Sequence, residues 1–276
     1  MIVAVVSGKG GAGKTTLAVS LAHTFGARLY DLDVDAPNAE HFLQPQIDST
    51  VAITQPYPAF SAELCTGCGL CTRECRFHAL YKLGTTVYLT ESLCHGCGLC
   101  RELCPIQAIR YQEACIGTVR RGVSARSGNE VVIGDLAIGS TRSTYLIRKI
   151  VADLPATGLT VLDGPPGNSC AAVAAMQPAD LIVLVVEPTP FGFHDMCQTE
   201  QIVTQLGKPY LIIVNKETNA ATTAALFRDH PRRPVFSLPL TAAYHEAHLA
   251  GEILSQRFVE VRDQLEKNLA GRLLKQ

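Results

Sequence analysis

A glycine-rich stretch near the start of the chain has the residue types that bind phosphate groups. Residues 7–16 read SGKGGAGKTT and follow the apolar run 2–6. Four of them have the spacing G-x-x-x-x-G-K-T, namely Gly8, Gly13, Lys14 and Thr15. Glycines let backbone N–H groups approach phosphate oxygens, a lysine neutralises their charge, and a threonine hydroxyl can bind Mg²⁺. A second lysine, Lys9, lies within the stretch, although phosphate binding alone does not require it.

We expect this stretch to bind the phosphates of a nucleotide. The backbone N–H groups of residues 10–15 would surround the β-phosphate, Lys14 would reach the β and γ oxygens, and Thr15 would bind Mg²⁺. The predicted binding residues are Gly8, Lys9, Gly10, Gly11, Ala12, Gly13, Lys14, Thr15 and Thr16. A glycine-rich turn without a ligand is the alternative, but the apolar strand before the loop and the helical pattern after it favour the phosphate site.

The cysteines form the second group of residues whose spacing indicates chemistry. The chain has 11 cysteines, and eight of them lie in two runs of identical spacing, C-x2-C-x2-C-x3-C. These eight are Cys65, Cys68, Cys71, Cys75, Cys94, Cys97, Cys100 and Cys104, whereas Cys115, Cys170 and Cys197 stand alone. Such spacing indicates metal binding rather than a disulfide framework. Structural zinc is the less favoured alternative, because zinc sites usually pair C-x2-C units at wide separation.

The elements that position these residues follow an alternating pattern. Apolar, β-branched runs occur at residues 2–7, 28–32, 159–163, 181–187, 210–215 and 234–238. Continuous apolar runs of this length fit strands buried on both faces of a mainly parallel sheet. The segments 15–25, 144–154 and 195–206 are long enough for crossover helices. The sequence therefore predicts an α/β fold with a doubly wound, mainly parallel sheet.

An internal repeat interrupts this pattern. The segment LCTGCGLCTRECRFHAL from Leu64 is matched 29 residues later by LCHGCGLCRELCPIQAI from Leu93. Because so short a segment has little apolar core, the repeat implies a small pseudo-symmetric module that a metal holds together. We expect residues 59–113 to form a small α+β domain inserted into a larger domain of residues 1–58 and 114–276. The stretch 117–139 is interpreted as a hairpin-rich linker or a mobile loop.

The cysteine module resembles bacterial ferredoxins with two [4Fe-4S] clusters, in which the fourth cysteine of each run binds the other cluster. The resemblance implies two ligand sets, Cys65, Cys68 and Cys71 with Cys104, and Cys94, Cys97 and Cys100 with Cys75. Pro105 follows Cys104 as is usual there, but Arg76 replaces the other proline. Such clusters suit electron transfer as well as storage or handover of iron–sulfur units, and the motif does not separate these uses.

The phosphate loop carries a second resemblance. Its segment KGGAGKTT resembles the deviant loop K-G-G-x-G-K-[ST] of the superfamily of MinD, ParA and the nitrogenase iron protein. In that superfamily the early lysine, here Lys9, reaches across a dimer interface to the nucleotide of the other subunit. The resemblance implies a Mg²⁺-dependent P-loop ATPase that forms an ATP-dependent homodimer. The implied catalytic residues are Lys9, Lys14 and Asp33.

Three further segments match the same superfamily. Asp33, in YDLDVDAPN, would orient the attacking water, which is a sufficient device because phosphoryl transfer needs little covalent help from the protein. Asp163, in VLDGPPG, would bind the ligands of Mg²⁺, such as its waters, rather than the ion itself. Asn215, in IIVNK, would contact the adenine base. Asp31 and Asp35 would either hold waters of Mg²⁺ or cap the loop, and these two roles stay open. A plain turn role is the alternative for Asp163 and Asn215.

Weaker signals are interpreted as structural. Cys170 lies seven residues after Asp163, an offset that resembles a shared cluster ligand of the nitrogenase iron protein, but a small packed thiol is the favoured interpretation. The segment 245–248, HEAH, lacks the H-E-x-x-H spacing of zinc enzymes and indicates an ordinary helix surface. Leu254, Phe258, Val261, Leu265, Leu269 and Leu273 form a helical stripe. We expect this helix to close the core, with a membrane-surface helix as the alternative.

Length and charge exclude several classes of protein. The 276 residues, 47% of them hydrophobic, suffice for one large domain with a small companion. The formal net charge is -1 and there are no long blocks of one sign, so the sequence indicates no basic segment that would bind nucleic acid. The chain has no apolar run near the roughly 18 residues that span a bilayer, and its first residues do not resemble a signal peptide. We therefore expect a cytoplasmic protein without a membrane or nucleic-acid partner.

Together the motifs predict an ATP-hydrolysing iron–sulfur protein with ATP, Mg²⁺ and two [4Fe-4S] clusters as cofactors. The leading hypothesis couples nucleotide-driven dimerisation to assembly or delivery of an iron–sulfur or related metal cluster, with an apo iron–sulfur acceptor as partner. The first alternative is an ATP-gated donor of low-potential electrons to a redox partner enzyme. The second is a spatial regulator like MinD or ParA, in which the clusters are structural or sensory.

Overall fold

The computed structural model describes residues 1–274, which form two compact units. Unit 1 comprises Met1–Val51, Val119–Asp135 and the chain from Ser143 onward. Unit 2 comprises Ala52–Thr118 and Leu136–Arg142. Its bounds are wider than the inserted segment 59–113 expected from the sequence, because the strands that enter and leave it are long. No helix within the described residues has the length and apolar content needed to cross a membrane.

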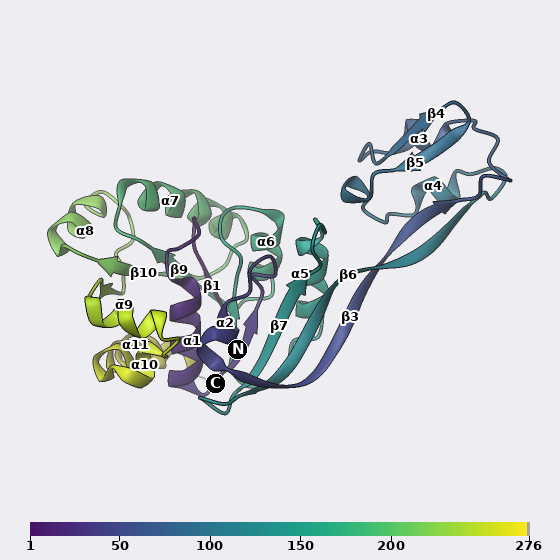
Figure 1. The fold of residues 1–276 in the computed structure, drawn as a ribbon. Coiled ribbons are helices and arrows are strands. Elements are labelled where there is room, and N and C mark those ends of the chain that lie inside the picture. Colours follow the sequence, from purple (N-terminus) through teal and green to yellow (C-terminus); the bar gives the residue numbers. More distant parts are fainter. Residues whose placement is uncertain (275–276) are drawn as a thin grey trace. The chain divides into compact units, whose positions relative to one another are not determined.

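Unit 1 is built on a sheet that runs in the order β11-β10-β9-β1-β8-β2-β7-β6-β3 within the described residues. Figure 1 shows β10, β9 and β1 among the helices of this unit. Its strands are β1 (Ile2–Val6), β2 (Arg28–Asp31), β3 (Pro45–Phe60), β6 (Ile109–Ser124), β7 (Glu130–Leu136), β8 (Thr160–Asp163), β9 (Leu181–Val186), β10 (Tyr210–Glu217) and β11 (Phe236–Pro239). The pairs from β11 to β7 are parallel. The mainly parallel α/β fold predicted from the apolar runs is therefore confirmed.

Helices cover the sheet, and both of its faces are buried. The helices of unit 1 are α1 (Lys14–Phe25), α2 (Ala39–Leu43), α5 (Ser143–Ala152), α6 (Cys170–Met176), α7 (Pro190–Gln205), α8 (Ala220–Leu226), α9 (Ala242–Leu249), α10 (Leu254–Arg257) and α11 (Val259–Leu273). Val3 and Val5 of β1 belong to the core that α1 and α11 cover, whereas the alternate residues Ala4 and Val6 are equally buried. Because side chains alternate along a strand, β1 is covered on two sides, as a continuous apolar run predicts.

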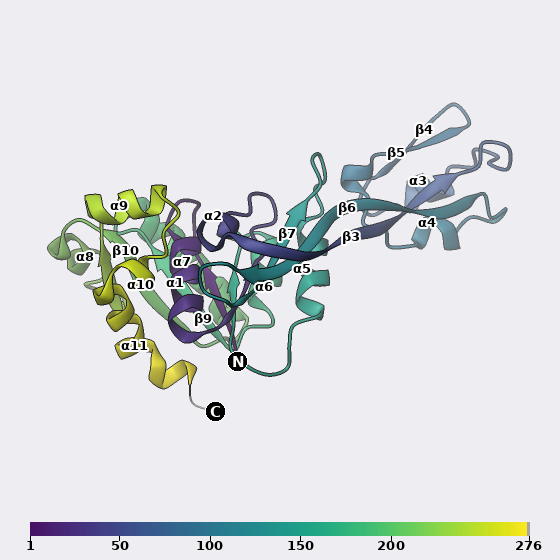
Figure 2. The same ribbon diagram turned by 60° about the horizontal axis from the view of Figure 1, so that its bottom comes forward.

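The predicted closing helix is confirmed by the position of α11. Its buried residues Val261, Leu265, Leu269 and Leu273 join the same core as α1. The stripe is broken at Phe258, where an extended backbone separates α10 from α11. Figure 2 shows these two helices beside α9 at one end of the sheet. The apolar face of α11 is thus used inside the protein, and the membrane-surface alternative loses its basis.

The stretch 117–139 forms a hairpin, as one of the two interpretations expected, but the hairpin belongs to the main sheet and is neither a linker nor a mobile loop. Most of it forms β6 and β7, with a turn at residues 125–129 between them. Val131, Val132 and Ile133 are fully buried, and β7 pairs in parallel with β2. No apolar period in this stretch, which is rich in glycine and arginine, predicts β7. The strand is buried because it pairs with the neighbouring β2.

The internal repeat of unit 2 is visible in its backbone. The unit contains α3 (Leu70–Glu74), β4 (Leu80–Leu83), β5 (Thr86–Leu89), the 3-10 turn Glu91–Leu93 and α4 (Leu99–Glu102). The φ angles are 51° at His78 and 52° at Gln107, two positions 29 residues apart. Such values are uncommon for residues other than glycine, so their recurrence at the offset of the sequence repeat shows that both halves adopt the same local conformation.

Candidate functional site

The phosphate loop lies at the carboxyl ends of three neighbouring strands of unit 1. β1, β8 and β2 are adjacent and parallel, and their register places Val5 beside Asp163 and Asp163 beside Asp31. The N–H of Gly164 donates to the Val5 carbonyl at 2.9 Å. Loops that follow the carboxyl ends of adjacent parallel strands form the usual ligand-binding crevice of such sheets. Residues far apart in the sequence therefore meet at one edge.

Two glycines of the loop occupy positions that a side chain would block. At Gly13 φ is 90°, and a Cβ atom would lie 2.0 Å from Asn215 Nδ2. At Gly8 a Cβ atom would lie 2.3 Å from the backbone of Asp195. Gly13 directly precedes α1, whose first turn carries no acidic side chain. The free N–H groups of this helix end therefore face a space suited to an anion.

A pocket of about 590 Å³ opens at this helix end. Eight of the predicted site residues line it, namely Gly10, Gly11, Gly13, Lys14, Thr15, Thr16, Asp33 and Asn215. Lys14 is buried at 5% exposure. Asn215 donates from Nδ2 to the Ala12 carbonyl at 2.9 Å, which fixes its amide beside the loop. Gly8, Lys9, Ala12 and Asp163 are not among the lining residues.

Asp163 is a buried carboxylate without a partner. It is fully buried, and neither of its oxygens has a hydrogen-bond partner among residues 1–274. Burial and the charge of Asp31 raise the pKa of Asp163 well above its usual range, while the nearby Thr15 hydroxyl and the Lys14 ammonium lower it less. A buried charge without a partner is costly, so this position calls for a cation. The hydroxyl of Thr15 and the carboxylate of Asp163 are oxygen donors of the kind that Mg²⁺ and its waters prefer, so the residues fit this ion.

Asp31 caps the loop after β2, which is one of the two roles that the sequence left open for it. Its oxygens accept from the backbone N–H groups of Asp33 at 3.1 Å and of Asn38 and Ala39 at 2.9 Å. Burial nevertheless outweighs these bonds and raises the pKa of Asp31 to about 7. The cap holds Asp33 at the pocket, where burial raises its pKa and the Lys14 ammonium opposes that rise. Asp35 is exposed.

Lys9 forms an ion pair within its own chain. Its Nζ lies 3.1 Å from Oε2 of Glu187, which follows β9, and both side chains are about one-third exposed. Ser7 donates from Oγ to the Lys9 carbonyl at 2.6 Å and so supports the bend of the loop at this point. Lys9 therefore points to the carboxylate of Glu187 rather than into the pocket of the same chain.

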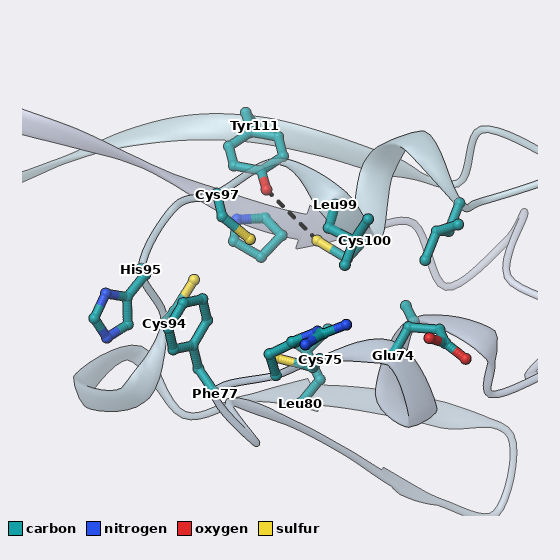
Figure 3. Close-up of a pocket in the computed structure, with 14 residues that line it drawn as sticks. Glu74, Cys75, Phe77, Leu80, Cys94, His95, Cys97, Leu99, Cys100 and Tyr111 are labelled. Carbon is teal, nitrogen blue, oxygen red and sulfur yellow. Dashed lines mark hydrogen bonds between the residues drawn. The ribbon is translucent and has the colours of Figure 1, made fainter.

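Unit 2 gathers the eight motif cysteines around two pockets. Cys75, Cys94, Cys97, Cys100 and also Cys71 line one pocket, and Figure 3 shows the sulfur atoms of the four labelled cysteines turned toward a common space. Cys65, Cys68, Cys71 and Cys104 line the other. The fourth cysteine of each run thus lies with the three cysteines of the other run.

Polar groups approach several of these sulfurs. The N–H of Gly96 donates to Cys94 Sγ at 3.4 Å and that of Ala108 to Cys104 Sγ at 3.3 Å. The Tyr111 hydroxyl lies 3.5 Å from Cys100 Sγ (Figure 3). Burial, with the neighbouring cysteines, raises the pKa of the Cys94 thiol and of the Cys100 thiol. A thiol set of this kind requires a metal centre to remain deprotonated at neutral pH.

The comparison with protein families decides the assignment of unit 1. Residues 3–253 match the family described as the CobQ/CobB/MinD/ParA nucleotide-binding domain. The chain belongs to this family. It is a P-loop ATPase of the MinD/ParA class, as the phosphate loop predicts.

The similar proteins agree with this assignment. The uncharacterized protein MJ0578 of Methanocaldococcus jannaschii is 32% identical over 225 residues, which are 79% of this chain and 78% of that protein. The uncharacterized protein MJ0579 of the same organism is 28% identical over 233 residues, 78% of this chain and 80% of that protein. The structure of MinD from Pyrococcus horikoshii complexed with Mg-ADP shares 14% identity and a TM-score of 0.58, covering 98% of this chain and 97% of that one. At this identity the structural likeness shows the fold.

The nucleotide pocket of this MinD/ParA-class ATPase also contains residues that the sequence did not assign to the site. These are Asn38, His41, Phe42, Lys216, Pro239, Leu240, Tyr244, His245, His248 and Leu254. His248 Nδ1 lies 3.2 Å from Thr16 Oγ1, and Lys216 donates from Nζ to the Gly11 carbonyl at 2.6 Å. His245 and His248 are exposed on α9, as the expected helix surface requires, and the structure adds that they also line the pocket. The histidines of HEAH were a visible signal, but their spacing had no known meaning.

The lone cysteines of the ATPase remain separate from the two cysteine groups. Cys170 is exposed at the start of α6, where Ser169 caps the helix by accepting from the Ala172 N–H. Cys115 is exposed and Cys197 is half-buried. None of the three forms a disulfide with another described residue. Within one chain, Cys170 is therefore an accessible thiol instead of the packed thiol expected.

Proposed function

We propose that this ATPase couples an ATP-dependent homodimer to the assembly or delivery of an iron–sulfur cluster. The observation that carries the proposal is the crossed arrangement of the two cysteine runs, with Cys104 beside the first run and Cys75 beside the second. Crossing of this kind matches the ligation of two [4Fe-4S] clusters. It occurs in the same chain as a nucleotide pocket, so one protein would combine ATP turnover with metal cargo.

The nucleotide side of the proposal rests on the pocket in unit 1. Lys14 would neutralise the β and γ oxygens of ATP, and Asp33 would orient the attacking water from its place on the pocket wall. Thr15 would hold Mg²⁺ directly and Asp163 through water, and the ion would supply positive charge to the phosphates. Asn215 would contact the adenine base with the amide atoms that its bond to Ala12 leaves free.

Dimerisation would use Lys9. Both side chains of its ion pair with Glu187 are about one-third exposed, so breaking the pair costs little in water. The γ-phosphate of ATP in a second chain would offer Lys9 a more strongly charged partner. We propose that the exchange of Glu187 for the phosphate of the partner chain links ATP binding to the closed dimer. The superfamily resemblance of the loop supports this role.

Delivery requires cluster ligands that an acceptor can displace. Cys68 and Cys97, one in each group, are exposed, whereas Cys94 is buried. An acceptor thiolate would form a new iron–sulfur bond as the bond to Cys68 or Cys97 breaks, and no net oxidation or reduction takes place. The released thiolate would take up a proton from water. Exposed ligands thus provide the starting point for transfer of a whole cluster.

The test is a transfer assay with full-length protein. The clusters are reconstituted anaerobically, an apo-ferredoxin is added with or without Mg²⁺-ATP, and iron is measured on both proteins. We expect ATP to increase the iron on the acceptor at the expense of the donor, and the Lys14→Ala variant to lose this dependence on ATP. Absence of transfer under every nucleotide condition, with both clusters cycling between redox states, would contradict delivery.

Electron donation is the second candidate function, and the position of Cys71 favours it. This cysteine lines both pockets, so clusters bound there would be neighbours that exchange electrons readily. The same assay separates the two functions. Donation predicts that iron stays on the ATPase while an electron acceptor becomes reduced, and that the acceptor stimulates ATP hydrolysis.

A further inference from the structure

Three potential metal ligands gather in unit 1, and none of them lines the nucleotide pocket or belongs to the eight motif cysteines. Cys197 and Glu200 lie on α7 at a spacing of three residues, which places them on the same helix face. His230 follows α8 along the chain. The sulfur of Cys197, a carboxylate oxygen of Glu200 and a ring nitrogen of His230 all lie within 4.8 Å of one another.

The imidazole of His230 faces an oxygen acceptor on each side. Its Nδ1 lies 2.8 Å from the Arg232 carbonyl oxygen and its Nε2 lies 2.9 Å from Glu200 Oε2. The Arg232 N–H also donates to Nδ1, at 3.2 Å. A neutral ring with its proton on Nε2 therefore donates to Glu200 and accepts from the Arg232 N–H. With the proton on Nδ1 instead, the lone pair of Nε2 faces the Glu200 carboxylate, and a cation between the two would bind both groups.

The surroundings hold these groups in place. The rings of Phe193 and Phe227 contact His230 edge to face, with centroids 5.6 and 5.5 Å from the imidazole. The Tyr210 hydroxyl donates to Glu200 Oε1, and the side chains of Glu200 and His230 are only 14% and 7% exposed. A histidine that donates its other ring N–H to a carbonyl, within an apolar shell, is the common arrangement around a bound metal.

We propose that Cys197, Glu200 and His230 bind a zinc ion, with water as the fourth ligand. Thiolate, imidazole and carboxylate are the three ligand types of protein zinc sites. Ligands of a tetrahedral zinc ion lie roughly 3.3–3.7 Å apart, given bonds of about 2.0–2.3 Å. The donors lie within 4.8 Å of one another, and Nε2 and Oε2 are 2.9 Å apart, so that pair would open slightly and any longer distance would shorten by about 1 Å at most. The ion would take the place of the proton between Nε2 and Glu200, and the Cys197 thiol would lose its proton to water. It would tie α7 to the segment after α8.

The first test uses the wild-type chain and needs no variant. Anaerobic protein is treated with iodoacetamide after dialysis against a chelator, with or without added Zn²⁺, and each cysteine is followed by peptide mass spectrometry. Zinc at about 100 times its Kd should leave about one Cys197 thiol in a hundred free to react. The exposed cysteines Cys115 and Cys170 are internal controls whose rates should not change. An equal rate at Cys197 with and without zinc would overturn the proposal.

The second test counts zinc in variants of the full chain. Cys197→Ser and His230→Gln should each bind one equivalent less than the wild type, whereas Cys115→Ser should bind the same amount. Tyr210→Phe removes the bond that orients Glu200 and should weaken zinc binding about tenfold or more. The wild type and these variants all keep the eight motif cysteines. Metal bound there is therefore the same in each protein and drops out of the difference in zinc content between them. Unchanged zinc content in Cys197→Ser would show that Glu200 and His230 form a plain ion pair.

Discussion

The unpartnered carboxylate of Asp163 gives the sharpest prediction. Replacing it by asparagine removes one of two charges that the register of β2 and β8 places side by side. The amide would donate a hydrogen bond to the carboxylate of Asp31. In the wild type the negative charge of Asp31 instead disfavours ionisation of Asp163. We expect Asp163→Asn to stabilise the nucleotide-free protein at pH 8 and to abolish both ATP hydrolysis and the stabilisation by Mg²⁺-ATP.

The pKa of the neighbouring Asp31 rises from 3.8 to about 7. A shift of about three units at about 1.4 kcal/mol each makes the ionised site about 4 kcal/mol less stable than the protonated one. Burial is the first cause of this shift and the charge of Asp33 is the repulsive one, so the gain from Asp163→Asn comes from Asp163 itself, whose pKa burial and the charge of Asp31 raise. We expect a gain of about 2 kcal/mol, within the roughly 1–3 kcal/mol that a buried polar group without a partner costs. For a domain of this size such a gain raises Tm by roughly 4–8 °C.

The pH dependence gives the sign of the effect. The pKa of Asp31 in the folded protein lies above its unfolded value, so its contribution to the free energy of unfolding is fully present below pH 3.8 and is lost as pH rises through about 7. We expect wild-type Tm, measured in EDTA without nucleotide, to fall across this window. The pKa of Asp163 is also raised in the folded protein, so its ionisation in the unfolded state adds to this fall. Asp163→Asn removes that contribution, so the fall is smaller in the variant and the two proteins converge near pH 4.

The matched control is Asp35→Asn, because Asp35 lies in the same loop but is exposed. Its Tm should equal that of the wild type at every pH. Two results would refute the reasoning. One is a lower Tm of Asp163→Asn than of wild type at pH 8, and the other is a difference between them that does not change with pH.

Three other predictions concern the loop, the dimer and the cysteines. Gly13→Ala places a Cβ atom 2.0 Å from Asn215 Nδ2 at a φ of 90°. It should therefore lower the free energy of unfolding by at least about 1–2 kcal/mol, which a lower Tm would show, and prevent ATP binding. Gly10→Ala, with open space around its Cβ, should leave the Tm of the nucleotide-free protein unchanged. Lys9→Ala should abolish ATP-dependent dimerisation and hydrolysis while the free energy of unfolding changes by less than about 1 kcal/mol, because both side chains of its ion pair are about one-third exposed. A dimer in gel filtration with ATP would show that Lys9 has no role between subunits. Cys104→Ser should reduce the iron content of reconstituted protein by about half or more, since one of two clusters loses a ligand, whereas full iron content in this variant would contradict the crossed ligand sets.

Local patterns predicted a large part of the fold. The buried strands β1, β8, β9 and β10 were visible as continuous apolar runs, because a parallel strand covered on both faces leaves no polar side. The stripe of α11 was visible because its period matches that of a helix. β7 was missed, since its burial comes from pairing with β2 and from the helices around it. The sequence predicted a hairpin-rich linker or a mobile loop at 117–139, so the hairpin was anticipated but its place in the main sheet was not.

The sequence by itself determined which chemical groups are present in the two motifs. The tertiary structure decided which other side chains are brought beside them. The loop from Gly8 to Thr16 and the two cysteine runs are local motifs, in which spacing along the chain sets the geometry. That Asp31 caps a loop while Asp163 stays without a partner depends on the order and register of neighbouring strands. The position of His248 at the pocket likewise depends on a helix more than 200 residues from the loop. Such contacts are set by packing between distant elements, which no periodicity along the chain records.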